Sequence, residues 1–289
     1  MTGDGPGRLK SGEPSATAMG VARRRAVHQL LDDPKVFEDP LATRIIGEGA
    51  LERLKAELDH QHHPFNRAIR AHVVARSRYA EDRLHDAYAR GVRQYLVLGA
   101  GLDTFAWRNP HDDLKVFEID HPSTQAWKLE RLQAAGVEAP ASLAFAPVDF
   151  QTQTLVEGLT AAGFDFAHPA FVSWLGVSMY LEEAAAVRTL TDLGAMAAGT
   201  EVVFDFGVPA ETLPPASRMA YEALAARVAA MGEPFLSAFD PKTLPARLNA
   251  LGFTEAEILG PDELNRLYFE GRADGLKIAG QSRIAQARV

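Results

Sequence analysis

The sequence predicts an α/β fold with a parallel sheet of about seven strands, a helical N-terminal segment and one inserted helix. After Gly91, short apolar runs alternate with helical stretches, which is the pattern of strands joined by crossover helices. A glycine-rich turn, Gly99-Ala100-Gly101, directly follows the first apolar run. With 289 residues, 47% of them hydrophobic, the chain is long enough to bury a sheet covered on both faces.

The first ninety residues divide into a leader and a helical segment. Residues 1–17 begin with a stretch rich in glycine and charge, so we expect a disordered leader. Residues 18–90 have the pattern of helices, and Asp33-Pro34 resembles an N-cap followed by proline at the first helical position. Gly91 should end the last of these helices. We expect residues 18–90 to form a helical lid.

The core should occupy residues 91–289. Seven short apolar runs have the length of strands, namely Tyr95–Leu98, Val116–Ile119, Leu143–Val148, Phe171–Leu175, Glu201–Phe206, Thr254–Leu259 and Leu276–Ala279. Helical stretches separate them near Ser123–Ala135, Thr152–Ala162 and Glu182–Ala198, each closely followed by a glycine.

Residues 214–234 interrupt the alternation and predict an inserted helix, Ala216–Met231, between the fifth and sixth strands. Insertions that follow the carboxyl end of a strand lie over the ligand crevice of an open α/β sheet. This helix and the N-terminal helices should therefore cover that crevice.

Composition excludes several classes of protein. The absence of cysteine rules out disulfides, thiolate metal sites and a cysteine nucleophile, and it fits a reducing cytoplasm. The net charge of −8 argues against general affinity for nucleic acid or an anionic membrane. No apolar run approaches the length of a membrane span. We expect a cytoplasmic protein with a small-molecule partner, and its oligomeric state stays open.

The turn Gly99-Ala100-Gly101 predicts a cofactor site. Glycine permits a tight turn and lets a ligand approach the backbone closely. Asp120 ends the next predicted strand, nineteen residues after Gly101, where an acid can accept hydrogen bonds from ribose hydroxyls. We expect a helix to follow the turn.

The residues after the turn discriminate between two cofactors. A dinucleotide would place its pyrophosphate where Asp103 would repel it and where Thr104 replaces a third glycine. S-adenosylmethionine has no phosphate and carries an ammonium group that an acid favours. The pattern therefore favours S-adenosylmethionine. An NAD(P)-dependent oxidoreductase and a catalytically silent cofactor-binding protein remain alternatives.

Asp149-Phe150 follows the third predicted strand. The carboxylate could accept from the exocyclic amine of adenine, and the ring could pack on the base. Asp149 also precedes a helical stretch, so a helix N-cap is the competing interpretation.

Together these segments resemble the leucine carboxyl methyltransferase family and its bacterial branch of S-adenosylmethionine-dependent methyltransferases. The resemblance covers residues 18–207 and is carried by Val74–Arg78, Val97–Thr104, Phe117–Asp120, Val148–Phe150 and Val177–Leu181. It implies a Rossmann-like seven-stranded methyltransferase sheet with a helical N-terminal lid. It also implies cofactor contacts by Gly99, Ala100, Gly101, Asp120, Asp149 and Phe150, and a grip of Arg76 on the methionine carboxylate.

The chain departs from the family at Leu175, where the family often has an acid after its fourth strand. We therefore do not transfer the leucine-carboxyl substrate. Trp174, Met179 and Tyr180 surround this position, and an apolar, aromatic pocket suits the dispersed charge of methyl transfer. We expect them to line the acceptor pocket, with core packing as the alternative.

No residue is identified as a catalytic base. A carboxylate acceptor needs none, whereas a hydroxyl needs deprotonation. His28 has the context of a structural histidine. Residues 59–63, Asp-His-Gln-His-His, lack the spacing of helical metal ligands, so we expect no metal site. The sequence predicts an S-adenosylmethionine-dependent O-methyltransferase that acts on a carboxylate or hydroxyl of a small metabolite.

Overall fold

A computed structural model of the chain describes residues 15–149, 153–230, 232–280 and 283–289. Its strands are β1 Gln94–Leu98, β2 Lys115–Asp120, β3 Leu143–Pro147, β4 Phe171–Trp174, β5 Glu201–Phe206, β6 Glu255–Leu259 and β7 Arg283–Arg288. Its helices are α1 Ala16–Leu31, α2 Ala42–Ile45, α3 Glu48–Ala56, α4 Pro64–Ala89, α5 Pro122–Ala134, α6 Leu155–Ala161, α7 Glu183–Gly194, α8 Pro215–Ala230, α9 Leu244–Ala250 and α10 Pro261–Tyr268.

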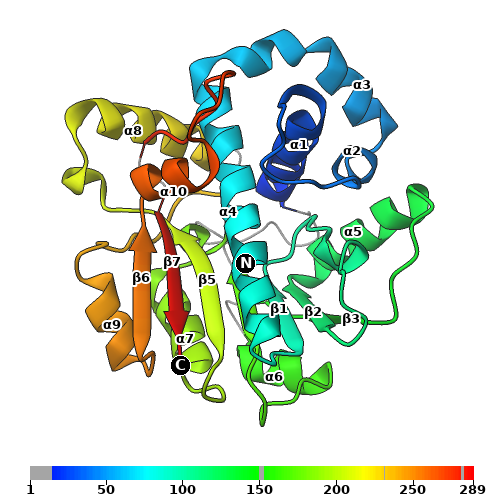
Figure 1. Cartoon of the computed structure of the whole chain (residues 1–289), viewed down its shortest axis with the longest axis vertical. Coiled ribbons are helices and arrows are strands. Elements are labelled where there is room, and N and C mark those ends of the chain that lie inside the picture. The colour runs from blue at the N-terminus through cyan, green and yellow to red at the C-terminus, as the bar shows by residue number, and fades with distance from the viewer. Residues whose placement is uncertain (1–14, 150–152, 231, 281–282) are drawn as a thin grey trace, which may run out of the picture.

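Within the described residues the strands form one seven-stranded sheet in the order β3-β2-β1-β4-β5-β7-β6. The five strands from β3 to β5 in this order pair in parallel, and β7 pairs antiparallel with both β5 and β6. The predicted α/β fold is confirmed, but the sheet is mixed, because the last strand returns against its neighbours. Helices α6, α7 and α9 share a buried core with one face, and α4 and α10 share one with the other (Figure 1).

The predicted seventh strand, Leu276–Ala279, is wrong. That segment is irregular, and the side chain of Asn265 bonds both the N–H and the C=O of Ile278, so these groups are not available to a sheet. The strand is Arg283–Arg288, in which Ile284, Ala285 and Ala287 are buried. Because this strand carries polar side chains, its hydrophobic pattern did not identify it, although it lies between β5 and β6 in the sheet.

The helix expected directly after the glycine turn is also absent from the described loop between β1 and β2, which holds only the 3₁₀ turn Phe105–Trp107. The carboxylate of Asp103 accepts from the N–H of Phe105, which starts a local turn. Asn109-Pro110 follows at once, and a residue before proline disfavours the helical region.

The first helix, α1, begins at Ala16, two residues before the predicted start of the helical segment. The hydroxyl of Ser15 accepts from the N–H of Ala18 and caps α1, so residues 16 and 17, assigned to the leader, are helical. Residues 1–14 lie outside the described residues. The inserted helix is present as α8, and its predicted last residue, Met231, is not described.

A buried polar triad fastens α1 to α4. His28 Nδ1 lies 2.7 Å from Asp32 Oδ2, and Arg70 donates to both oxygens of Asp32 over 2.7 and 3.0 Å. His28 Nε2 accepts from the N–H groups of Val36 and Phe37, which leaves the proton on Nδ1. His28 is fully buried and has a structural role, as predicted.

Among the described residues, no helix combines the length and the apolar character that a membrane span requires.

Candidate active site

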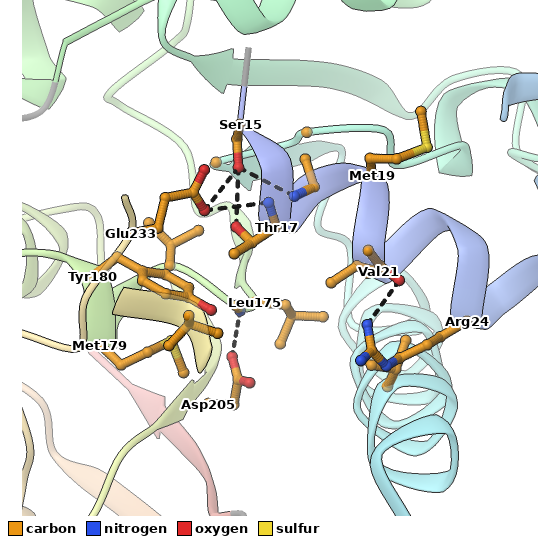
Figure 2. Close-up of a pocket in the computed structure, with 18 of the residues that line it drawn as sticks. Ser15, Thr17, Met19, Val21, Arg24, Leu175, Met179, Tyr180, Asp205 and Glu233 are labelled. Atoms are coloured by element: carbon orange, nitrogen blue, oxygen red, sulfur yellow. Dashed lines mark hydrogen bonds between the residues drawn. The ribbon is translucent and has the colours of Figure 1, made fainter. Parts of the chain in front are cut away.

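A cavity of about 1110 Å³ lies at the carboxyl ends of the parallel strands. The glycine turn after β1 and the ends of β2, β4 and β5 form its floor, and residues of α1, α4 and α8 form its walls and roof. This is the crevice at which open α/β sheets bind ligands. In Figure 2, Leu175 lies between Arg24 on one side and Tyr180 and Met179 on the other.

The glycine turn is built for close approach. Gly99 and Gly101 have φ values of +65° and +49°, a region that side-chain-bearing residues rarely adopt. A Cβ on Gly99 would lie 2.2 Å from Cγ2 of Val177, and one on Gly101 would lie 3.1 Å from Cβ of Ala18. The N–H groups of Gly99 and Ala100 both donate to the carbonyl of Ile119, so β2 holds the turn in place.

Asp120 lies at the end of β2 beside this turn and lines the cavity. Its Oδ2 accepts from the N–H of Gly101 over 2.5 Å, and its Oδ1 accepts from the N–H of His121 over 2.6 Å. Burial raises the pKa of Asp120, and these two hydrogen bonds oppose the rise. The carboxylate is therefore held in one orientation, and its remaining lone pairs could accept from ribose hydroxyls.

Asp149 is half-buried and lines the same cavity after β3. Its N–H donates to the side chain of Gln153, which lies two residues before the start of α6. The N-cap of α6 is Thr154, so Asp149 does not cap that helix. Phe150 lies outside the described residues.

Arg76 belongs to a buried cluster that the sequence did not reveal. Its Nη1 donates to Oδ2 of Asp205 at the end of β5 over 2.6 Å, and His72 Nε2 lies 3.3 Å from the same oxygen. The other oxygen of Asp205 accepts from the N–H of Gly176 over 2.5 Å. Burial would raise the pKa of Asp205, but Arg76, His72 and Gly176 bring it well below its ordinary value.

Two signals could have identified this cluster. Asp205 is an acid at the carboxyl end of a predicted strand, the same reason that Asp120 was chosen. His72 precedes Arg76 by four residues on α4, so the two share one helix face. Burial lowers the pKa of His72, which makes its ring neutral at neutral pH.

The predicted acceptor residues separate into two groups. Met179 and Tyr180 line the cavity, and the ring of Tyr180 lies 5.4 Å from that of Phe235. Trp174 does not line it: the side chain is fully buried and packs against Phe204. The prediction for Trp174 was wrong because successive side chains along a strand point to opposite faces of the sheet. Ser173 and Leu175 face the cavity, and Trp174 faces the core on the other side.

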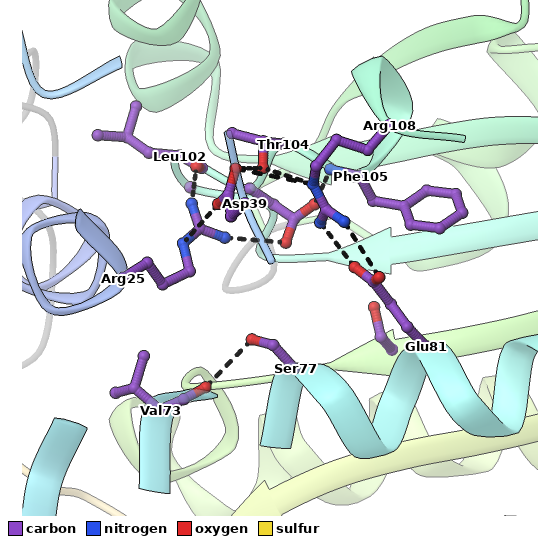
Figure 3. Close-up of polar contacts among 12 residues, drawn as sticks. Arg25, Asp39, Val73, Ser77, Glu81, Leu102, Thr104, Phe105 and Arg108 are labelled. Carbon is purple, nitrogen blue, oxygen red and sulfur yellow. Dashed lines mark hydrogen bonds and ion pairs between the residues drawn. The ribbon is translucent and has the colours of Figure 1, made fainter. Parts of the chain in front are cut away.

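A polar network holds α1 against the glycine turn (Figure 3). Arg25 forms ion pairs with Asp39 at 3.4 Å and Asp103 at 3.3 Å, and it also donates to the carbonyl of Leu102. Thr104 donates to Asp39 over 2.7 Å. The charge of Asp103 is therefore compensated, so its expected repulsion of a pyrophosphate is weaker than the sequence suggested.

In the described part of the chain, no group of three or more His, Asp or Glu side chains is placed to hold a metal ion. The residues of the cavity instead fit a nucleoside cofactor with a charged tail. Gly99 and Gly101 leave space beside the backbone that a Cβ would fill. Asp120 supplies a carboxylate held in one orientation, and Arg76 supplies a guanidinium.

Comparison with known proteins agrees with this geometry. The family model described as leucine carboxyl methyltransferase matches residues 18–194. YktD of Bacillus subtilis (strain 168) is 31% identical to this chain, and the match covers 93% of this chain and 95% of YktD. YktD is named as a proposed S-adenosyl-L-methionine-dependent methyltransferase. A Frankia alni protein with the same proposed activity is 32% identical over 71% of this chain and 72% of its own.

Solved structures share the fold. A protein from Thermobifida fusca YX, described as a proposed methyltransferase, superposes with a TM-score of 0.58 at 17% identity and covers 96% of this chain and 95% of that one. This likeness concerns the fold alone. The family model and the identity over nearly the whole chain show that the protein belongs to the leucine carboxyl methyltransferase family, a family of S-adenosyl-L-methionine-dependent methyltransferases.

Proposed function

We propose that the protein is an O-methyltransferase that transfers the methyl group of S-adenosyl-L-methionine to a carboxylate or hydroxyl of a small-molecule acceptor. One observation carries the proposal. A single covered cavity joins the glycine turn and Asp120 at one end to an apolar wall with Met179 and Tyr180 at the other. Such a cavity has room for a nucleoside cofactor and a small acceptor together.

The cofactor half of the cavity would be organised by four contacts. Gly99 and Gly101 let the backbone approach the cofactor, and Asp120 would accept from its ribose. Asp149 would contact the adenine amine. Arg76 would bind the methionine carboxylate, and Asp205 would hold the guanidinium in position for it.

When bound, S-adenosyl-L-methionine supplies an activated methyl group on a sulfonium. The protein's task is then to align the acceptor and to exclude water. Helices α1 and α8 would serve as the lid, because Glu233, which follows α8, accepts from the N–H of Thr17 over 3.2 Å and from the hydroxyl of Ser15 over 3.3 Å. This link closes the roof of the cavity at the start of α1.

The acceptor half favours a group that needs no strong base. Burial raises the pKa of Tyr180 to about 12, so its phenol stays protonated at neutral pH. Asp205 is engaged by Arg76 and His72. A carboxylate acceptor would require no deprotonation, whereas for a hydroxyl the neutral ring of His72 would be the candidate base. The family description, leucine carboxyl methyltransferase, also favours a carboxylate. A cytoplasmic location stays a prediction.

The test has two stages. Calorimetric titration with S-adenosylhomocysteine and with NADH should show binding of the first alone, and Asp120→Ala should weaken that binding at least tenfold, the scale of one charge-assisted hydrogen bond. Binding of NADH alone would refute the cofactor assignment.

The second stage incubates the protein with methyl-labelled cofactor and a panel of paired carboxylic acids and phenols. Carboxyl methyl esters release volatile methanol in alkali, and methyl ethers do not. Label in alkali-stable N-methyl or C-methyl products alone would refute O-methylation. Labelled ester or ether that disappears with Asp120→Ala would support it.

A further inference from the structure

In the part of the chain that the structure describes, Arg24 and Arg227 line the cavity without a carboxylate partner. Arg24 on α1 and Arg227 on α8 both line the cavity. Within the described residues, neither forms an ion pair, and the hydrogen bond of Arg24 is to the carbonyl of Gly20 in its own helix, over 3.0 Å. Arg25 and Arg76, which also line the cavity, each form an ion pair with an aspartate, and Arg23 lines the cavity from an exposed position on α1.

The arrangement places like charges together. Burial and the positive charges of Arg227 and Arg76 together lower the pKa of Arg24 to about 10, and Tyr180 opposes this shift. No carboxylate is among the groups that shift this pKa. Bringing cations together in a partly covered cavity costs free energy, and an anion bound between them would repay that cost. Perturbed charges that line a cavity are a recognised mark of a functional site.

Two of the acids that line the cavity are engaged with other groups. Asp205 accepts from Arg76 and from the N–H of Gly176, and Glu233 accepts from Ser15 and the N–H of Thr17. Leu175 stands where the family often has an acid, so the centre of the cavity lacks that negative charge (Figure 2). The positive charge of Arg24 and Arg227 is therefore available to a ligand.

The wall opposite Arg24 is aromatic. The ring of Tyr180 lies 5.4 Å from that of Phe235, and Phe235 stacks on Tyr221 at 5.7 Å with an interplanar angle of 10°. All three residues line the cavity. A flat apolar body fits against such a wall, with its charged end toward the arginines.

We propose that Arg24 and Arg227 form an anion-binding subsite for the acceptor, and that the acceptor is an organic acid with a planar apolar body. This inference extends the proposed function and rests on it, because the bound acid is a methyl acceptor only if the protein transfers methyl groups. The lid helix and the inserted helix each contribute one arginine, so binding of the acid would also draw the two elements together over the cavity.

Calorimetry with sodium benzoate as the probe and benzamide as its uncharged counterpart tests the subsite at constant ionic strength. The titrations are made with protein saturated with S-adenosylhomocysteine and repeated without it. We expect benzoate to bind at least tenfold more tightly than benzamide. Arg24→Gln and Arg227→Gln should each weaken benzoate about tenfold, the scale of one charge-assisted hydrogen bond.

The affinity for S-adenosylhomocysteine should stay within about threefold in Arg227→Gln and Arg24→Gln, which also shows that both variants are folded. Arg266→Gln removes the same charge from an exposed position on α10 and should change neither affinity.

Equal binding of benzoate and benzamide, or no benzoate binding at tens of millimolar, would overturn the subsite. Loss of S-adenosylhomocysteine affinity in Arg24→Gln with unchanged benzoate affinity would assign Arg24 to the cofactor carboxylate instead. If the wild-type protein does not bind S-adenosylhomocysteine, the proposed function fails. The titrations made without it would still decide whether the anion subsite exists.

Discussion

Replacing Gly99 by alanine should destabilise the protein by about 2–5 kcal/mol, from two separable contributions. The φ value of +65° places the residue in the left-handed region, which costs a side-chain-bearing residue about 1–2 kcal/mol. The new Cβ would also lie 2.2 Å from Cγ2 of Val177, and overpacking of this kind costs about 1–3 kcal/mol.

The two contributions can be measured separately with a control glycine. Gly136 has a φ of +63° and open space around its Cβ position, so Gly136→Ala should cost only the backbone contribution of about 1–2 kcal/mol. Val177→Ala removes Cγ2, the atom with which the new Cβ of Gly99→Ala would overlap. In the double variant, the overpacking contribution should disappear, which gives a favourable coupling of about 1–3 kcal/mol.

Urea unfolding followed by circular dichroism supplies the free energies of unfolding for all four variants. Titration with S-adenosylhomocysteine should show weaker binding for Gly99→Ala and unchanged binding for Gly136→Ala. If Gly99→Ala costs no more stability than Gly136→Ala, or if Val177→Ala fails to relieve it, the reasoning about close approach at this turn is wrong.

Three further outcomes follow from other parts of the structure. Asp205→Asn should cost about 3–5 kcal/mol in urea unfolding, because it leaves the buried guanidinium of Arg76 uncompensated, and a loss below about 1 kcal/mol would contradict the ion pair. His28 and Arg70 overcome the effect of burial and lower the pKa of Asp32 to about 2 from 3.8, so its contribution of about 2 kcal/mol is present above pH 3.8 and is lost as the pH falls through 2. Stability measured between pH 5 and pH 2 should fall less steeply in Asp32→Asn, and equal slopes would refute this assignment. Glu233→Ala should speed the release of S-adenosylhomocysteine by about threefold to tenfold, because the link to α1 contributes about 1 kcal/mol, and surface plasmon resonance measures that rate. An unchanged release rate would mean that this contact does not hold the lid.

Local pattern was sufficient for the parallel part of the sheet. Continuous apolar runs such as those of β1 and β4 can be recognised because both faces of a central parallel strand are buried. The glycine turn was equally visible, because Gly99 and Gly101 directly follow a strand and Asp120 lies nineteen residues after Gly101. Strand β7 was missed because its residues carry half-buried polar side chains, and its neighbours β5 and β6 are distant in sequence or separated by α10.

The amino-acid sequence by itself determined the fold class, the glycine turn after β1 and the membership of Met179 and Tyr180 in the cavity wall. Only the tertiary structure decided that Trp174 faces the core and that Asp205 holds Arg76 and His72. It also placed Arg24 and Arg227 in one cavity, where neither has a partner acid among the described residues. The physical reason is the separation along the chain of the residues that decide each property. Backbone conformation and strand burial depend on neighbouring residues, whereas the charge environment of a side chain depends on groups that folding brings together from helices and strands far apart in the chain.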